Sequence, residues 1–248
     1  MPNIIIMGAS SGLGYGLAEH YVARGWNVGL AARRTEPLQE LAAKAADGQR
    51  VETARIDVCR PHEAAAALQL LHERLGGPLN VYLHCSGIGR MTPEIRYDDE
   101  LPMLETNVLG WTACVDWAYG IIEGQSYGQL AAITSFAANR GLAPAPAYAS
   151  TKAFQAHYLE SLRQRAMARS LHRVYITDLR PGFVATPLLA HPKRLFWVLT
   201  PERAVHALLR AIDRRDNVAT ITLRWRLLAP VLRLAPRWIV AKILGKAL

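Results

Sequence analysis

The amino-terminal stretch that decides the fold reads Asn3-Ile-Ile-Ile-Met7-Gly8-Ala9-Ser10-Ser11-Gly12-Leu13-Gly14. Its apolar start predicts a buried strand, and the apolar side chains of residues 13–24 have helical spacing. Glycines between a strand and a helix let the backbone approach a pyrophosphate, and a helix N-terminus favours negative charge. The stretch therefore predicts a strand, a phosphate-binding turn and a helix, in that order.

Outward from this stretch, short apolar runs alternate with longer helical patterns. We expect strands at 3–7, 27–32, 51–56, 80–84, 129–134, 173–178 and 218–222, and helices at 13–24, 35–46, 61–75, 98–119, 148–170 and 201–213. Crossovers between parallel strands must cover the sheet, so the alternation predicts an α/β fold. Its doubly wound, Rossmann-type parallel sheet has about seven strands with helices on both faces, and ligands bind beyond the carboxyl ends of the strands.

A second stretch, from Ser135 to Lys152, carries the groups expected to do chemistry. Ser135 follows an expected strand, and Tyr148 opens an expected helix with Lys152 one turn later on the same face. An ammonium group so near lowers the pKa of a phenol, so Lys152 would tune Tyr148 as acid and base. Ser135 would hold the substrate oxygen. An ordinary Tyr–Lys pair on a helix surface is the alternative for this spacing alone.

Together the two stretches resemble the short-chain dehydrogenase/reductase family, in its small single-domain branch. Further segments match in the family's order: Asp57-Val58, His84-Cys85-Ser86-Gly87, Asn107, and Pro181-Gly182-Phe183-Val184-Ala185-Thr186. The resemblance implies that these segments contact the adenine, the ribose and the nicotinamide of a dinucleotide. The sequence departs from the family at His84-Cys85-Ser86, where two asparagines are usual.

The resemblance also implies a mechanism. Hydride passes between the nicotinamide and a carbonyl carbon, while Tyr148 protonates the oxygen that Ser135 holds. Lys152 would bind the nicotinamide ribose as well as tune the tyrosine, and Asn107 would keep a water in a proton relay. A dinucleotide-binding sensor or a membrane-associated scaffold without turnover is the alternative to an enzyme, and the changed segment at His84 favours that alternative.

The second expected strand ends at Arg33-Arg34, and no acidic residue stands beside it. A carboxylate here would accept hydrogen bonds from the ribose of NAD, whereas guanidinium groups pair with the 2′-phosphate of NADP. NADP(H) is therefore the expected cofactor, with Ser10 or Ser11 as helpers. Two solvated arginines before a helix are the alternative.

The substrate loop expected at 187–200 is rich in apolar residues, so we expect a hydrophobic aldehyde, ketone or secondary alcohol. An anionic substrate is the alternative, because His191, Lys193 and Arg194 lie in the same loop. The catalytic domain would span residues 1–223. The three cysteines and eight histidines lack metal-ligand spacing, so we expect no metal and buried free thiols in a reducing cytoplasm. The amino terminus lacks a signal-peptide pattern.

The remaining segment, 224–248, has six basic and no acidic residues, although the whole chain carries a net charge of only +9. Prolines and frequent charges exclude a transmembrane span. An amphipathic helix pair on an anionic membrane, with Trp225 and Trp238 at the interface, and packing on the domain or a partner both remain open. No motif supports nucleic-acid binding.

The resemblance implies a homodimer or homotetramer built on the helices at 98–119 and 148–170. The apolar residues compatible with that interface are Leu104, Trp111, Phe154, Leu159 and Leu162. The same side chains could instead face the sheet.

Overall fold

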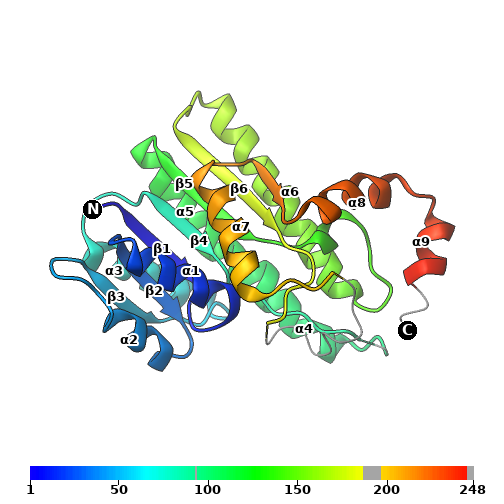
Figure 1. Ribbon diagram of the computed structural model, residues 1–248, viewed down its shortest axis with the longest axis horizontal. Coiled ribbons are helices and arrows are strands. Elements are labelled where there is room, and N and C mark those ends of the chain that lie inside the picture. Colours follow the sequence, from blue (N-terminus) through cyan, green and yellow to red (C-terminus); the bar gives the residue numbers. More distant parts are fainter. Residues whose placement is uncertain (93, 187–196, 245–248) are drawn as a thin grey trace.

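The computed structural model of the 248-residue chain describes residues 1–92, 94–186 and 197–244. Within these ranges, one sheet of seven parallel strands has the order β3-β2-β1-β4-β5-β6-β7 (Figure 1). The strands are β1 (Asn3–Met7), β2 (Asn27–Ala32), β3 (Val51–Arg55), β4 (Val81–His84), β5 (Gly128–Ile133), β6 (Val174–Arg180) and β7 (Val218–Thr220). The predicted doubly wound parallel sheet is confirmed.

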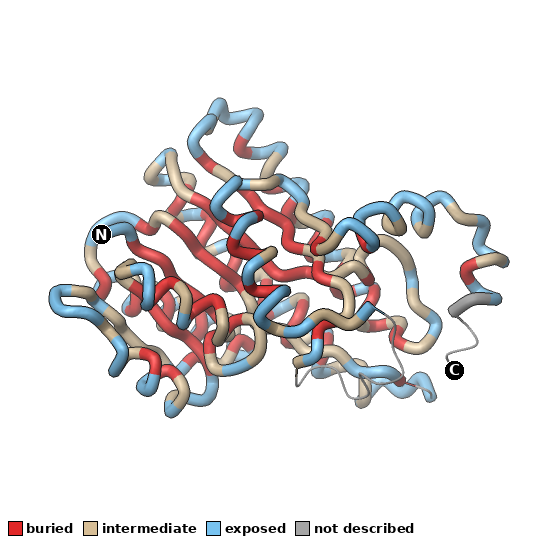
Figure 2. Tube along the Cα trace, viewed as in Figure 1, coloured by how far each residue is buried: buried red, intermediate tan, exposed pale blue. Residues whose placement is uncertain are grey.

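Helices cover both faces of the sheet. One face carries α1 (Gly12–Ala23), α2 (Glu36–Ala42) and α7 (Pro201–Asp213). The other carries α3 (Pro61–Leu75), α5 (Trp111–Gln125) and α6 (Pro146–Ala168). Figure 2 shows the buried chain concentrated in the strands and in the helix faces that meet them.

The alternation within β1 explains why both faces are covered. Ile4 and Ile6 point into the hydrophobic cluster of α1 and α7, whereas Ile5 and Met7 point into the cluster of α3 and α5. All four side chains are buried, because successive residues of a strand face opposite sides of the sheet. A strand that is apolar at every position therefore requires two helical layers.

The helix predicted at 98–119 is wrong as one continuous α-helix. The structure has α4 (Tyr97–Leu104), the π-helix η1 (Glu105–Gly110) and then α5. Pro102 lies inside α4 and lacks a backbone N–H. Gly110 lies so close to Val58 that a Cβ there would overlap the Val58 carbonyl oxygen. The π turn accommodates this close approach.

Other corrections concern ends and faces of elements. The helix expected at 35–46 ends at Ala42, and the helix expected to open at Tyr148 begins two residues earlier, at Pro146. Trp111, Leu159 and Leu162 lie in the core beside the sheet and so leave the expected dimer face. Cys59 is exposed, contrary to the expectation of three buried thiols.

The carboxyl-terminal segment forms α8 (Leu223–Leu234) and α9 (Arg237–Leu244), which extend from the sheet edge next to β7 (Figure 1). Trp225 is 3% exposed and packs on the domain, so it is wrong as a membrane-interface residue. Among the described residues, no helix has the length and apolar character that crossing a bilayer requires.

Candidate active site

The strand order reverses between β1 and β4, so a crevice is expected where these two strands end. The Cys85 N–H donates to the Met7 carbonyl oxygen over 2.7 Å and holds the two ends together. Gly8 has φ of +90°, and a Cβ there would lie 2.6 Å from the Ser86 nitrogen. Only glycine fits at this position.

The turn that follows is shaped by backbone contacts. A Cβ on Gly14 would overlap the Gly8 carbonyl oxygen, and Gly12 has φ of +57°. Ser11 precedes α1 but makes no side-chain hydrogen bond to it, so no capping side chain uses the first N–H groups of the helix. Thr186 lies across from Gly12, at 3.7 Å from the position of a Cβ. This cradle fits the pyrophosphate of a dinucleotide.

Two exposed arginines follow β2, on the same side as the cradle. Arg34 donates through Nη2 to the Ser10 carbonyl oxygen at 3.4 Å, and Arg33 is exposed. After β3, the Asp57 carboxylate accepts from the Cys59 N–H at 3.1 Å, and the Val58 side chain is buried. Both strand ends thus place side chains beside the turn at Gly8.

The structure brings Ser135, Tyr148 and Lys152 together at the carboxyl end of β5. Ser135 caps the short 3-10 helix η2 (Phe136–Asn139) and accepts from the Ala137 N–H at 3.1 Å. The Tyr148 side chain lies near the Ser135 hydroxyl, which acts to lower the Tyr148 pKa. The Lys152 Nζ lies 6.0 Å from the centroid of the Tyr148 ring.

The expected lowering of the Tyr148 pKa is wrong when only the groups of the protein itself act on the phenol. Burial raises the pKa of Tyr148, and the nearby Ser135 hydroxyl opposes part of that rise. Burial also lowers the pKa of Lys152 to about 8, while the negative charge of Asp178 works in the opposite direction. Lys152 remains mostly protonated at neutral pH.

Lys152 is buried and donates two hydrogen bonds. Its Nζ donates to the Ile133 carbonyl oxygen at 3.3 Å and to Gln155 Oε1 at 2.9 Å. Gln155 in turn donates through Nε2 to the Asn107 carbonyl oxygen at 2.8 Å. The glutamine amide therefore joins Lys152 to η1.

Asn107 acts on the neighbouring backbone. Its Nδ2 donates to the Ile88 carbonyl oxygen at 2.7 Å, and its Oδ1 accepts from the Ile88 N–H at 2.9 Å. A Cβ on Gly87 would lie 3.3 Å from both Asn107 Oδ1 and Lys152 Nζ. Asn107 thus holds the segment after β4 next to Lys152. The carbonyl oxygen of Asn107 accepts the hydrogen bond from Gln155.

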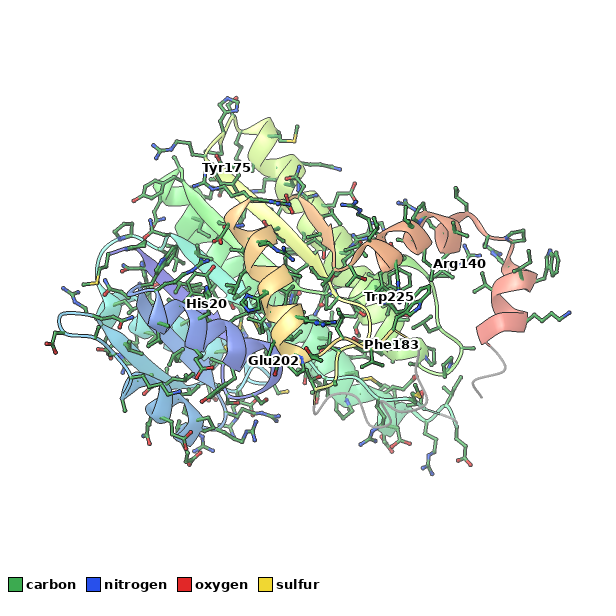
Figure 3. The ribbon with its side chains drawn as sticks, viewed as in Figure 1. His20, Arg140, Tyr175, Phe183, Glu202 and Trp225 are labelled. Carbon is green, nitrogen blue, oxygen red and sulfur yellow. The ribbon has the colours of Figure 1, made fainter. Side chains whose placement is uncertain are left out.

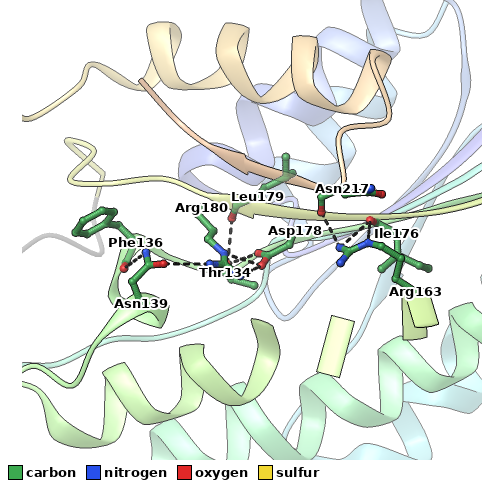
Figure 4. Close-up of polar contacts among 9 residues, drawn as sticks. All are labelled: Thr134, Phe136, Asn139, Arg163, Ile176, Asp178, Leu179, Arg180 and Asn217. Carbon is green, nitrogen blue, oxygen red and sulfur yellow. Dashed lines mark hydrogen bonds and ion pairs between the residues drawn. The ribbon is translucent and has the colours of Figure 1, made fainter. Parts of the chain in front are cut away.

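A polar network begins at Thr134, the residue before Ser135 in the chain (Figure 4). The Thr134 hydroxyl donates to Asp178, and Arg180 donates through Nε to the same carboxylate at 2.7 Å. Arg180 Nη1 also donates to Asn139 Oδ1 at 3.2 Å, and Asn139 Nδ2 donates to the Phe136 carbonyl oxygen at 2.8 Å. The network ties β6 to the segment that carries Ser135.

An aromatic cluster borders the site where α8 begins. Trp225 lies 4.5 Å from Phe136 and 5.5 Å from Phe183, measured between ring centroids (Figure 3). Trp197 lies 5.5 Å from Trp225. Gly182 is in such close contact that a Cβ there would overlap the Trp225 ring. The segment from Pro181 to Thr186 is thus held from one side by the carboxyl-terminal segment.

The sequence profile described as short chain dehydrogenase matches residues 2–194. The chain belongs to the short-chain dehydrogenase family. An uncharacterized oxidoreductase of Myxococcus xanthus is 32% identical over 91% of this chain and 88% of its own length. The NADP-dependent 3-hydroxy acid dehydrogenase of Schizosaccharomyces pombe is 26% identical over 87% of this chain and 88% of its own length.

Solved structures agree on the fold. A short-chain dehydrogenase from Sphingobium yanoikuyae in complex with NADPH has a TM-score of 0.80 at 24% identity, with 93% of each chain covered. This similarity supports the short-chain dehydrogenase architecture. It shows the fold alone, because identity is low.

Within this short-chain dehydrogenase, His84 at the end of β4 is buried, and Cys85 and Ser86 after it are partly buried. His84 Nδ1 and the Tyr82 hydroxyl form a hydrogen bond of 2.9 Å. Burial lowers the pKa of His84 to about 3. Burial raises the pKa of the Cys85 thiol. His84 is therefore neutral at pH 7, and Cys85 is a protonated thiol between the cradle and Lys152.

Sequence reasoning missed Gln155, Thr134 and Asp178. Gln155 stands three residues after Lys152 on one helix face, which is a signal that could have found it. Asp178 is an acidic residue inside an apolar run, a pattern that indicates a buried partner. Residues 187–196 of the expected substrate loop lie outside the described residues. No group of three metal-ligating side chains occurs in the part of the chain that the structure describes.

Proposed function

We propose that this short-chain dehydrogenase transfers hydride between NADP(H) and a carbonyl compound or secondary alcohol, with Tyr148 as acid and base. The supporting observation is that Ser135, Tyr148 and Lys152 lie together at the sheet edge that carries the glycine cradle. A sensor would need the cradle but has no need of the acid.

The cradle would hold the pyrophosphate, and neighbouring strand ends would hold the rest of the dinucleotide. When bound, the nicotinamide supplies or accepts the hydride. The chain would contact the dinucleotide through Gly8, Ser10, Ser11, Gly12, Leu13, Gly14, Arg33, Arg34, Asp57, Val58, Cys85, Ser86, Gly87, Asn107, Tyr148, Lys152, Pro181, Gly182, Val184 and Thr186.

In the reductive direction, Tyr148 donates its phenolic proton to the carbonyl oxygen, and the Ser135 hydroxyl donates a hydrogen bond to the same oxygen. Loss of that proton leaves a phenolate in a site where burial disfavours negative charge. The nearby Lys152 ammonium stabilises the phenolate. Lys152 is held in place by Ile133 and Gln155.

Preference for NADP(H) rests on the residues after β2. Arg33 and Arg34 are exposed at the strand end, and Arg34 already contacts the backbone of the cradle at Ser10. Guanidinium groups pair with a 2′-phosphate, and a carboxylate at this place would repel it. We expect Arg33→Asp to weaken NADPH binding far more than NADH binding, measured by nicotinamide fluorescence.

A hydrophobic aldehyde or ketone is the proposed substrate class. The aromatic cluster of Phe136, Phe183, Trp197 and Trp225 stands next to Ser135 and offers an apolar wall. An apolar wall favours substrates that lose hydration readily. Reduction of a panel of aliphatic and aromatic carbonyl compounds, ranked by kcat/KM, tests this proposal.

The central experiment combines cofactor binding with turnover. NADPH and NADH are titrated into the protein by fluorescence, and the carbonyl panel is then added. Tyr148→Phe should lower turnover by about 10²- to 10⁴-fold with NADPH binding retained. Tyr97→Phe, at an exposed tyrosine of α4, is the matched control and should leave turnover unchanged.

Two results would contradict the proposal. Full turnover by Tyr148→Phe would remove the tyrosine from the mechanism. Tight NADPH binding by wild type without turnover on any panel member would favour the sensor.

We also propose a homodimer or homotetramer built on α6 and on the stretch formed by α4, η1 and α5. Leu104, Leu109 and Phe154 remain partly or largely exposed there, which supports an apolar contact between copies. Light scattering after size exclusion measures the state, and Phe154→Glu should shift it toward the monomer.

A further inference from the structure

The helix α8 is apolar on two opposite sides. Its inner side carries Trp225, which is buried against Gly182 and Phe136 and packs on the domain. The contact between the carboxyl-terminal segment and its own subunit is thus already made by the inner side. The second apolar side of the helix, which does not face the domain, therefore needs another apolar environment to cover it.

The outer side of α8 carries a line of exposed apolar residues, here called the outer stripe: Leu223, Leu227, Val231 and Leu234. At about 100° per residue, these four fall within an arc of about 80°, on the side opposite Trp225. Leu227 is 63% exposed and Leu234 is 83% exposed. Farther on, Trp238 of α9 is 70% exposed. Side chains of this size are rarely left in a row in water without a partner.

Basic residues border the outer stripe on both sides. By the same helical geometry, Arg224 lies along one side and Arg226 and Arg233 along the other. All three are exposed, and α9 adds Arg237 and Lys242. From 217 to 248 the sequence has no Asp or Glu. An apolar stripe between two cationic borders matches the interface of a bilayer that carries negative headgroups.

Cations also line a cavity beside α9. The cavity has a volume of about 460 Å³, and Arg140 and Arg237 are its charged lining residues. Arg140 also donates to the carbonyl oxygens of Arg233 and Ala235, both at 3.0 Å, and so fixes the end of α8 to the domain. The stripe is therefore presented by a helix that is anchored on the folded protein at both ends, through Trp225 and Arg140.

A second copy of the chain fits this surface less well. Two copies that met through their outer stripes would bring their basic borders together without an acidic residue from either α8 or α9. Like charges across an interface oppose association. We propose that the outer stripe and its basic border dock the protein on an anionic lipid surface, as a peripheral contact that does not depend on turnover.

The test is co-flotation of the full chain with lipid vesicles. Vesicles of phosphatidylcholine with about one-third phosphatidylserine should bind the protein, whereas pure phosphatidylcholine should bind it at least about tenfold less, because each basic residue near an anionic surface adds to binding. High salt should weaken binding to the anionic vesicles.

Leu227→Glu should reduce binding to the anionic vesicles about tenfold or more, because it removes an apolar side chain from the bilayer and adds a negative charge. Leu70→Glu is the matched control, because Leu70 is 60% exposed on the distant helix α3. It should bind as wild type does. Arg226→Gln combined with Arg233→Gln should also reduce binding about tenfold, and it serves if Leu227→Glu fails to fold.

Three outcomes would overturn the proposal. The first is that the wild type binds no vesicles, and the second is that it binds neutral and anionic vesicles equally. The third is that Leu227→Glu and Leu70→Glu bind the anionic vesicles equally well. An oligomer that Leu227→Glu dissociates, in a protein that binds no vesicles, would assign the stripe to a second copy instead.

Discussion

The glycine cradle and the trio of Ser135, Tyr148 and Lys152 lie at the same edge of the sheet, but they are built from different parts of the chain. The cradle is made of backbone, and its shape depends on missing side chains at Gly8 and Gly14. The trio is made of side chains that buried hydrogen bonds support: Lys152 donates to Gln155, and Thr134, the residue before Ser135, donates to Asp178. Damage to the cradle should therefore be steric, whereas damage to the trio should be electrostatic.

The largest effect is expected at the cradle. Gly14→Ala would place a Cβ against the Gly8 carbonyl oxygen, which belongs to the rigid end of β1. We expect a loss of about 4 kcal/mol in the free energy of unfolding and a loss of dinucleotide binding. Urea denaturation and NADPH fluorescence measure the two effects.

The control for Gly14→Ala is Gly120→Ala in α5, where nothing lies within 4 Å of the new Cβ. It should stabilise the protein by about 0.5 to 1 kcal/mol, because alanine is the better helix former. Equal stability of both variants would show that the turn can relax, and the steric account of the cradle would fail.

The second effect tests the support of the trio. Asp178→Asn leaves Arg180 without its buried anionic partner and weakens the bond from Thr134. We expect a loss of about 3 kcal/mol in unfolding free energy. The pKa of Lys152 should fall further, because Asp178 raises it. The pH dependence of kcat should move to lower pH, which a purely structural loss would not produce.

Asp47→Asn, at an exposed aspartate, is the control for Asp178→Asn. It should change stability by less than about 0.5 kcal/mol. A kcat profile that does not move in Asp178→Asn would mean that its charge does not reach the catalytic lysine.

The third prediction concerns Lys152→Met, which should raise the stability of the protein but abolish its activity. Burial lowers the pKa of Lys152 from 10.5 to about 8, so the unfolded state binds more protons between these values. The free energy of unfolding of the wild type therefore rises as the pH rises from about 8 to 10.5. Below about pH 8, the buried charge lowers the free energy of unfolding by its full amount. Lys152→Met should stabilise the protein by about 2 kcal/mol at pH 7, after loss of two hydrogen bonds, and should abolish turnover.

For Lys152→Met, the gain should shrink as the pH rises toward 10.5. Unfolding free energies at pH 7 and 10 check the trend, with the exposed Lys44→Met as the control. If Lys152→Met is less stable than the wild type at pH 7, the view that the buried Lys152 ammonium destabilises the fold is contradicted.

The smallest effect concerns the segment between cradle and trio. Burial lowers the pKa of His84 to about 3, so the unfolded state binds the extra proton below about pH 6.5 and wild-type stability falls as the pH falls. His84→Asn should remove about 1 kcal/mol of the stability difference between pH 7 and pH 5.5. Urea denaturation at both pH values measures it.

The exposed His62→Asn is the control for this comparison, and it should keep the wild-type dependence on pH. An unchanged dependence in His84→Asn would indicate that His84 takes up its proton without unfolding.

Local patterns predicted most of the fold, because apolar periodicity and glycine turns act over a few residues. The ranges 3–7, 27–32, 61–75 and 201–213 agree with the structure at both ends. The π-helix could not be predicted, because apolar spacing over one turn does not distinguish a π turn from an α turn.

The candidate site divides in the same way. The spacing of Tyr148 and Lys152 is local and visible in the sequence. The bond from Gln155 to Asn107 and the bond from Thr134 to Asp178 join elements more than 40 residues apart. The expected fall in the Tyr148 pKa was wrong, because the sequence shows that Lys152 is near but does not show that the Tyr148 phenol is buried.

The π-helix η1 has a consequence for the length of the chain. A π turn holds about one residue more than an α turn, so the helical stretch from Tyr97 to Gln125 contains a local surplus of one residue. Removing Leu109, which is exposed, would take out this surplus and let an ordinary α-helix form while its two halves keep nearly the same faces. Within α5, where the helix is regular, removing one residue would instead turn one part of the helix by about 100° against the other. A one-residue deletion should therefore be less harmful in η1 than in α5.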